Sequence, residues 1–153
     1  MTSTNPATPP SHAILLVDDN VHGMVARRRV LLDLGYQVQT ATSGEEALKL
    51  ITEGSCKFDV IVTDFRMFSM DGIELIAHVR TICPGTRTVL LSALVEPWGM
   101  TEESTGADAV IAKSAGEIGQ LTRIVQRFLA KPVKKKPAAS VKRAAAVNVV
   151  ENG

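Results

Sequence analysis

Five residues that could do chemistry each follow an apolar run in the sequence. The run AILLV leads into Asp18 and Asp19, the run VIVT leads into Asp64, and two later runs end at Ser92 and Lys113. Three carboxylates that lie close together repel one another unless a cation joins them, and Mg2+ prefers oxygen ligands. Beside such an ion, a carboxylate could attack a phosphoryl group and become an acyl phosphate, with the lysine and the hydroxyl group stabilising the transferring oxygens.

The elements that must position these residues are predicted from hydrophobic periodicity. Short apolar runs alternate with helical patterns as five βα units, which predicts an α/β fold with a parallel sheet and helices on both faces. Because ligands bind beyond the carboxyl ends of strands in open sheets of this kind, we expect the five residues to converge at one edge. Taken alone, Asp18 and Asp19 favour the plainer interpretation of a polar strand end before the helix cap Asn20, and the other three residues in order change that balance. The predicted strands cover residues 13–17, 36–41, 58–64, 86–92 and 107–113.

The helical patterns differ in strength along the chain. Helices are predicted between Asn20 and Gly35, over 43–51 and over 71–83, and a last helix carries an apolar stripe from Ile118 to Leu129. The stretch EPWGMTEESTGA holds a proline and a glycine where a helix should form. That stretch therefore predicts only a short or irregular helix.

Composition and charge bound the function. The chain has 153 residues, of which 45% are hydrophobic and 22% are charged, which is typical of a globular domain. We expect residues 1–11 to be a flexible lead-in, residues 12–130 to form the domain and residues 131–153 to be a basic, disordered tail. No apolar run is long enough to span a membrane and no secretory signal is evident, so we expect a cytoplasmic protein.

The tail reverses the charge balance of the chain. Residues 131–153 hold six basic residues and one acidic residue, a net charge of +5, so the total of +1 leaves −4 for residues 1–130. Three interpretations of the tail stay open: a solvated extension, weak non-specific contact with nucleic acid, or attraction to an anionic membrane surface. The tail has no aromatic residues for base stacking, which argues against sequence-specific recognition.

Other reactive or prominent residues give weaker signals. Cys56 and Cys83 form no CxxC motif, which favours two separate reduced thiols over a disulfide or a metal site. The three histidines are scattered, so neither a zinc site nor a catalytic triad is indicated. The consecutive arginines 27–29 are interpreted as a solvated surface, with partner docking as the alternative. Trp98 is interpreted as a loop residue that packs locally or contacts a partner.

Four motifs in order resemble one family. VDDN, VTDFRM…MDGIEL, LLSAL and GADAVIAK occur in the order and at the spacing of the receiver domain of two-component response regulators, the CheY-like family. The resemblance covers about residues 12–130. It implies the flavodoxin-like (βα)5 fold, a doubly wound five-stranded parallel sheet with strand order 2-1-3-4-5.

The resemblance also implies a metal site. Asp19 and Asp64 would bind Mg2+ directly, together with the backbone carbonyl of Arg66. Asp18 would act mostly through a metal-bound water.

The resemblance gives the remaining residues roles in a phosphoryl switch. Asp64 would be the phosphoacceptor, Lys113 would contact the phosphoryl group and Asp64, and Ser92 would be the switch hydroxyl. The donor would be a histidine kinase or a phosphotransfer protein, and the output would pass through protein contacts, because no output domain follows in the sequence. The domain would assist its own phosphorylation and dephosphorylation without being a classical enzyme, and a homodimer is possible.

Three positions depart from the family pattern. Ser114 replaces the usual proline after the lysine, so a trans peptide is expected there, and Lys113 could aim differently. Val110 replaces the usual aromatic switch residue, and Phe68 replaces a common proline in the loop after the acceptor. Because a valine cannot make the aromatic swing, the alternative function is a receiver-like interaction module that binds its partner without phosphate. A phosphatase of the haloacid-dehalogenase type is disfavoured, since its D-x-D motif is absent.

Overall fold

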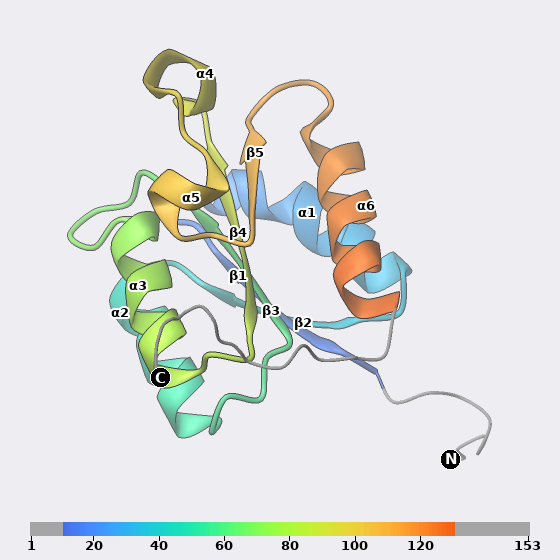
Figure 1. Cartoon of the computed structure of the whole chain (residues 1–153). Helices are drawn as coiled ribbons and strands as arrows, with labels where there is room; N and C mark the ends of the chain where they lie inside the picture. The colour runs from blue at the N-terminus through green and yellow to red at the C-terminus, as the bar shows by residue number, and fades with distance from the viewer. Residues whose placement is uncertain (1–10, 131–153) are drawn as a thin grey trace.

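A parallel sheet of five strands forms the centre of the computed structural model, which describes residues 11–130 (Figure 1). Each strand begins within two residues of the start predicted from its apolar run. The strands are β1 (Ala13–Val17), β2 (Gln37–Ala41), β3 (Val60–Asp64), β4 (Arg87–Ser92) and β5 (Ala109–Ala112). Their order in the sheet is β2-β1-β3-β4-β5, which confirms the predicted flavodoxin-like topology.

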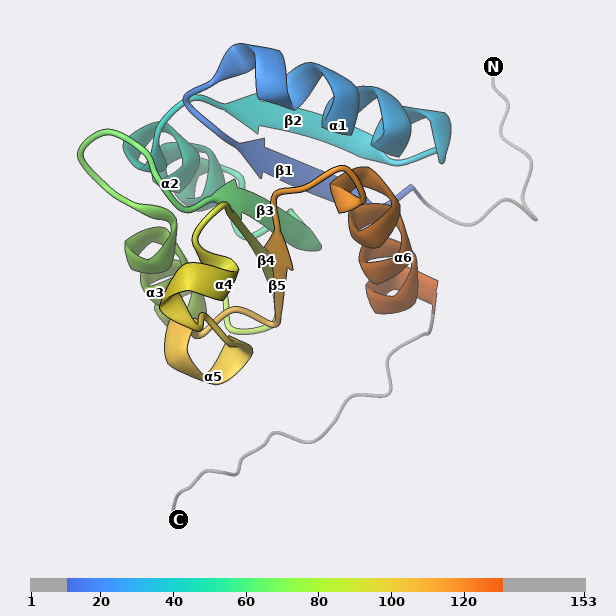
Figure 2. The ribbon, with the colours of Figure 1, turned by 90° about the horizontal axis from the view of Figure 1, so that it is seen from above.

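Helices cover both faces of this sheet (Figure 2). The four long helices confirm the predicted ones, and the stretch with Pro97 and Gly99 forms two four-residue helices, as its composition indicated. The helices are α1 (Val21–Asp33), α2 (Gly44–Glu53), α3 (Gly72–Ile82), α4 (Val95–Trp98), α5 (Glu102–Thr105) and α6 (Glu117–Ala130).

Two apolar layers hold the helices to the sheet. Alternate strand residues point to opposite faces, so Ile14 and Leu16 pack with α1 and α6, whereas Leu15 and Val17 pack with α2 and α3. A smaller cluster around Leu90 joins α3 to the segment that holds α4 and α5. The central strands are buried on both faces, which is why they read as continuous apolar runs.

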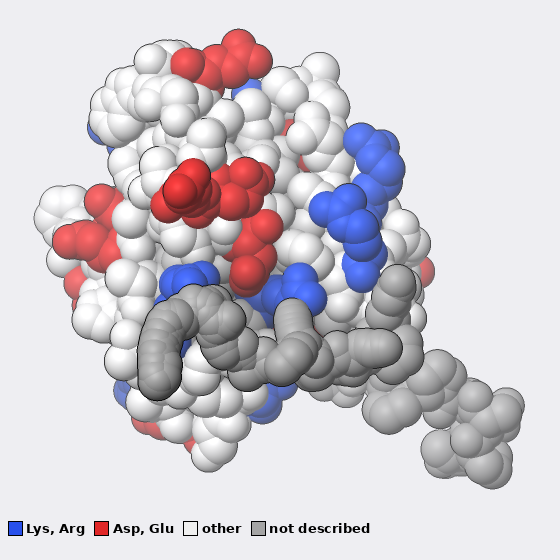
Figure 3. All heavy atoms as spheres, viewed as in Figure 1, with Lys and Arg blue, Asp and Glu red and all other residues white. Residues whose placement is uncertain are grey.

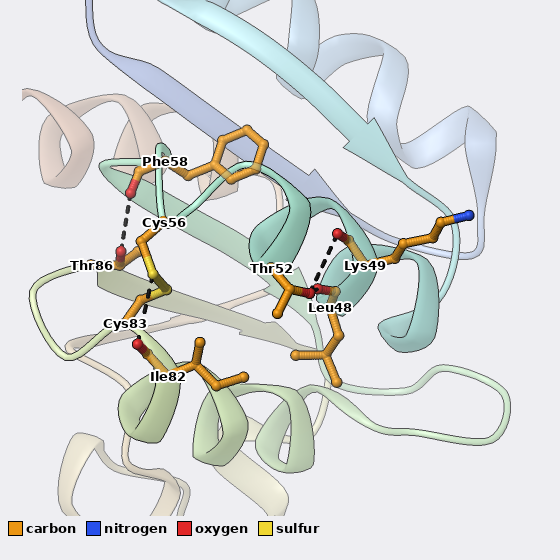
Figure 4. The surroundings of a disulfide bond; sticks show 8 residues. All are labelled: Leu48, Lys49, Thr52, Cys56, Phe58, Ile82, Cys83 and Thr86. Atoms are coloured by element: carbon orange, nitrogen blue, oxygen red, sulfur yellow. Dashed lines mark hydrogen bonds between the residues drawn. A yellow bond between two sulfur atoms is a disulfide. The ribbon is translucent and has the colours of Figure 1, made fainter.

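A disulfide contradicts the prediction of two separate thiols. Cys56 and Cys83 are joined, with their Cα atoms 5.7 Å apart (Figure 4). Ser55 and Cys56 adopt positive φ angles of 54° and 61° in the turn after α2, a conformation rare outside glycine, and Cys83 is the C-cap of α3. The sequence separation of 27 residues hid this pairing, because two cysteines that far apart meet only through packing of α2 and α3.

No helix among residues 11–130 is both long enough and apolar enough to cross a bilayer. The predicted tail, 131–153, and the predicted lead-in up to residue 10 lie outside the described residues.

Candidate functional site

Three carboxylates meet at the carboxyl edge of the sheet, as predicted. Asp18 and Asp19 follow β1 and Asp64 ends β3, and these two strands are neighbours with Val17 opposite Thr63. One oxygen of each carboxylate lies within 4.8 Å of the other two. We call Asp18, Asp19 and Asp64 the acidic cluster. Its donor set is oxygen only, which fits a hard divalent cation such as Mg2+.

Backbone groups orient two members of the acidic cluster. The Asn20 N–H donates to Oδ1 of Asp18 at 2.9 Å, while the Asn20 side chain caps α1 as predicted. The Phe68 N–H donates to Oδ2 of Asp19 at 3.2 Å and ties the β3–α3 loop to β1. The loop can lie close to β3 because α3 begins with a glycine, Gly72, packed against the strand. A Cβ at Gly72 would lie 2.4 Å from the Asp64 carbonyl oxygen, so a larger residue would not fit there.

A pocket of about 300 Å³ opens beside Asp64. Lys113, at the end of β5, forms an ion pair with Oδ1 of Asp64. Ser92, at the end of β4, is buried, and its hydroxyl accepts the Leu94 N–H at 2.9 Å. We call this space the Lys113 pocket. Its lining residues are Asp64, Arg66, Ser92, Ala93, Leu94 and Lys113.

The peptide bond between Lys113 and Ser114 is trans, as expected for a residue other than proline, since residues 11–130 contain no cis peptide bond. The ammonium group nevertheless reaches Asp64, because the Lys113 N–H extends the sheet by donating to the Ser92 carbonyl at 3.0 Å. The proline is therefore not needed to aim this lysine at the acidic cluster.

Burial makes Asp64 costly to ionise. Desolvation raises the pKa of its carboxyl group, and the Asp18 charge raises it further. The ammonium of Lys113 and the guanidinium of Arg27 lower it, and the balance leaves the pKa above the ordinary value. A buried carboxylate under these opposing influences is typical of functional sites.

Arg27 was predicted to be part of a solvated surface, and that prediction is wrong. Its guanidinium is buried, with 6% of the residue exposed, and it donates to Asp18 at 2.8 Å and to Glu117 at the start of α6. The two carboxylates hold the pKa of Arg27 above its usual value, although burial by itself would lower it. A signal was present in the sequence: Arg27 lies between Met24 and Leu31 at the helical spacing of the buried face of α1.

Two of the three departures from the family pattern, Val110 and Phe68, and the loop residue Trp98 also have definite places. Val110 is half-buried at the edge of the cluster around Leu90, and its N–H donates to the carboxylate of Glu102 in α5 at 3.2 Å. Phe68 is 85% exposed, so the ring is presented to solvent. Trp98 is also largely exposed and packs edge-on against Phe65 with ring centroids 5.8 Å apart.

Charged side chains gather by sign on the face shown in Figure 3. Acidic atoms lie over α5, which carries Glu102 and Glu103, and basic atoms lie along α6, which carries exposed Arg123 and Arg127. The edge strand β5 runs between these two helices. This face therefore presents two charge surfaces of opposite sign side by side.

Comparison with known proteins gives one consistent family. The family described as response regulator receiver domain matches residues 14–126. The transcriptional regulatory protein GlrR of Escherichia coli strain K12 is 34% identical over 118 residues, which cover 77% of this chain. The match covers only 24% of GlrR, so this chain spans about a quarter of that regulator.

Two solved structures agree with the fold and with the site. Response regulator TrrA of Thermotoga maritima, in complex with Mg2+ and BeF, is 28% identical with a TM-score of 0.68, covering 77% of this chain and 99% of that one. The receiver domain of sensor histidine kinase PA1611 of Pseudomonas aeruginosa has a magnesium ion in its active-site cleft. It is 25% identical with a TM-score of 0.68, covering 80% of this chain and all of that one.

The sheet order, the acidic cluster and the family match over residues 14–126 lead to one assignment. This chain belongs to the response regulator receiver domains, the signalling domains of two-component systems.

Proposed function

We propose that this receiver domain is a phosphoacceptor and that Asp64 is the residue phosphorylated. The observation that carries the proposal is the ion pair of Lys113 with Asp64 at the Lys113 pocket, next to the carboxylates of Asp18 and Asp19. A receiver domain implies a histidine kinase as partner. We infer that the donor is the phosphohistidine of such a kinase or of a phosphotransfer protein.

The residues of the Lys113 pocket support in-line phosphoryl transfer. A carboxylate oxygen of Asp64 attacks phosphorus, the P–N bond to the histidine breaks, and its electron pair returns to the imidazole nitrogen. Lys113 then faces the phosphoryl oxygens and offsets their charge, while the Ser92 hydroxyl, which now accepts the Leu94 N–H, is free to donate its proton to them. The product is an acyl phosphate on Asp64.

The acidic cluster is proposed to hold Mg2+, and Mg2+ has been observed in the related TrrA and PA1611 receiver structures. Asp19 and Asp64 would be direct ligands with the Arg66 carbonyl, and Asp18 would act through water. Bound there, the ion supplies charge neutralisation to the three carboxylates and to the phosphoryl oxygens.

The test is the intact mass of the full chain after incubation with Mg2+ and acetyl phosphate. We expect a single phosphoryl adduct on the wild type, and none on Asp64→Asn or in the presence of EDTA. Asp59→Asn is a matched control, because Asp59 directly precedes the same strand at the opposite edge, and this variant should keep the adduct.

The absence of an adduct on folded wild type would overturn the proposal. That outcome would favour the alternative, an interaction module that binds its partner without phosphate, which Val110 at the switch position supports. The homodimer, the downstream protein partner and the weak nucleic-acid contact of the tail stay predictions.

A further inference from the structure

Arg27 connects the acidic cluster to α6, and the proposed function leaves this residue without a role. It lies in the middle of α1, where its guanidinium donates through one nitrogen to Oδ2 of Asp18 and through Nε to Glu117. All three side chains are buried, with exposed fractions of 6% for Arg27, 2% for Asp18 and 8% for Glu117. The pairing of Arg27 with Asp18 is direct, because the two side-chain atoms lie 2.8 Å apart.

Both oxygens of Asp18 are therefore engaged by the protein. Oδ1 accepts the Asn20 N–H at 2.9 Å and Oδ2 accepts Arg27 at 2.8 Å. Asp19 and Asp64 have no guanidinium partner among residues 11–130, and only Asp64 is paired with a lysine. Asp18 is thus the member of the acidic cluster with a protein partner on each carboxylate oxygen, and it shares the charge of Arg27 with Glu117.

A glycine makes room for this arrangement. A Cβ at Gly23 would lie 3.3 Å from both an Arg27 nitrogen and Oδ2 of Asp18, which is tighter than ordinary contact. Glycine inside a helix costs about 1 kcal/mol relative to alanine. The first turn of α1 therefore carries a helix-destabilising residue at the one place where the Arg27–Asp18 pair passes the backbone.

We propose that Arg27 is a positioning residue that competes with Mg2+ for the Asp18 carboxylate, and that Glu117 moderates this competition by sharing the guanidinium. This inference rests on the proposed metal site. Because coupling between two sites is reciprocal, an ion that draws on the charge of Asp18 also loosens its hold on Arg27, and Glu117 then retains the guanidinium at the start of α6.

Two variants, one single and one double, should shift the competition in opposite directions. Glu117→Gln keeps an oxygen for Nε of Arg27 but removes the charge, so Arg27 holds Asp18 more firmly and the local charge rises by one. We expect Mg2+ to bind roughly 3–10-fold more weakly. The double variant Arg27→Leu/Glu117→Leu preserves the net charge and frees Asp18, and we expect Mg2+ to bind about tenfold more tightly.

The measurement is isothermal titration of the full chain with MgCl2 at constant ionic strength, with folding checked by circular dichroism. Arg28→Leu is the matched control: it removes an exposed positive charge one residue along α1, and its Mg2+ affinity should stay within about twofold of wild type. A merely structural role of Arg27 would change stability in every variant without opposite changes in Mg2+ affinity.

The outcomes separate this inference from the proposed function. If wild type binds Mg2+ and folded Glu117→Gln binds it with unchanged or higher affinity, the competition is overturned while the phosphoacceptor proposal stands. If neither wild type nor any variant binds Mg2+, the proposed metal site falls and the inference falls with it. Should the double variant fail to fold, Glu117→Gln alone decides the matter, because it keeps Arg27 hydrogen-bonded.

Discussion

Aspartates stand at both edges of the sheet, but their surroundings differ. At the amino edge, which is the end of the sheet where the strands begin, Asp59 accepts the Ala13 N–H at 2.9 Å and Asp108 accepts the Thr88 N–H at 2.8 Å. At the carboxyl edge, Asp18 and Asp64 lie against each other and against cationic side chains. Parallel strands present free N–H groups at one edge and carbonyl oxygens at the other.

Strand N–H groups therefore donate to the carboxylates at the amino edge, whereas at the carboxyl edge the backbone donors are the loop N–H groups of Asn20 and Phe68. There, charge has to come from elsewhere: from Arg27, from Lys113 or from a metal ion. The amino edge is fastened in addition by the disulfide and by the Thr86 hydroxyl, which donates to the Phe58 carbonyl (Figure 4). The amino edge is thus held by covalent and hydrogen bonds, whereas the carboxyl edge is held by ion pairs.

Among the changes that test this difference between the edges, removal of Arg27 should cause the largest loss in the free energy of unfolding. Arg27→Ala leaves Asp18 and Glu117 buried without their cation, and we expect a loss of about 4 kcal/mol in the free energy of unfolding. Urea unfolding followed by circular dichroism measures it. Arg28→Ala, at an exposed position, is the control, and a loss below 1 kcal/mol for Arg27→Ala would contradict the burial argument.

Loss of the disulfide should weaken the amino edge alone. Cys56→Ala/Cys83→Ala removes a crosslink across 27 residues, and we expect a loss of about 3 kcal/mol. Urea unfolding without reductant measures the loss, and wild type with excess dithiol should match the variant. Mg2+ affinity should not change, because the acidic cluster lies at the opposite edge. If the free energy of unfolding of wild type were the same with and without the dithiol, the predicted stabilisation by the disulfide would be contradicted.

Replacing one aspartate by asparagine should change the free energy of unfolding in opposite directions at the two edges. The raised pKa of Asp64 means that its protonated form favours the fold, so its stabilising contribution is present below the unfolded pKa and is lost as pH rises through the folded pKa. Asparagine mimics the protonated form. In EDTA at pH 7, Asp64→Asn should therefore be more stable than wild type by roughly 1 kcal/mol, with the gain vanishing in acid.

Asp59→Asn is the matched variant at the amino edge. It weakens a charge-assisted bond to the Ala13 N–H, and we expect a loss of roughly 1 kcal/mol at pH 7. Thermal and urea unfolding across pH give both comparisons. If Asp64→Asn and Asp59→Asn changed the free energy of unfolding in the same direction, the proposed difference between the edges would be wrong.

The smallest effect is expected at Phe68. Its ring is 85% exposed at the carboxyl edge, so Phe68→Ala should change the free energy of unfolding by less than about 0.5 kcal/mol. The backbone N–H that donates to Asp19 is kept in this variant, so Mg2+ affinity should also be unchanged. A larger loss of stability would mean that the ring packs against the domain in solution.

The strands and the acidic cluster were predictable because their signals are local. A strand buried on both faces must be a short apolar run, and the residue after the run must lie at the edge where β1 and β3 end side by side. The irregular segment before β5 was also predictable, since Pro97 and Gly99 act on the backbone nearest to them. The sequence alone therefore predicts Asp18, Asp19 and Asp64 as members of the acidic cluster.

The pairing of Arg27 with Glu117 and the disulfide could not be predicted from the sequence, because both depend on residues that are distant in the chain. The burial of Arg27 depends on Glu117, which is 90 residues away in the chain, and on how α1 and α6 sit against the same face of the sheet. Cys56 and Cys83 depend on the packing of α2 against α3. The spacing of Arg27 between Met24 and Leu31 indicates a buried position, but it does not indicate the distant partner Glu117. The two isolated cysteines carry no local sign of each other.

The sequence by itself determined which residues reach the carboxyl edge, because hydrophobic periodicity sets strand ends and strand ends set the edge. Only the tertiary structure decided how the charges there are shared. Ion pairing depends on distances of a few ångströms between groups from different elements, and those distances are set by strand pairing and helix packing together. The residues of the acidic cluster can thus be predicted from the sequence, whereas the pairing of Asp18 with Arg27 can be seen only in the tertiary structure.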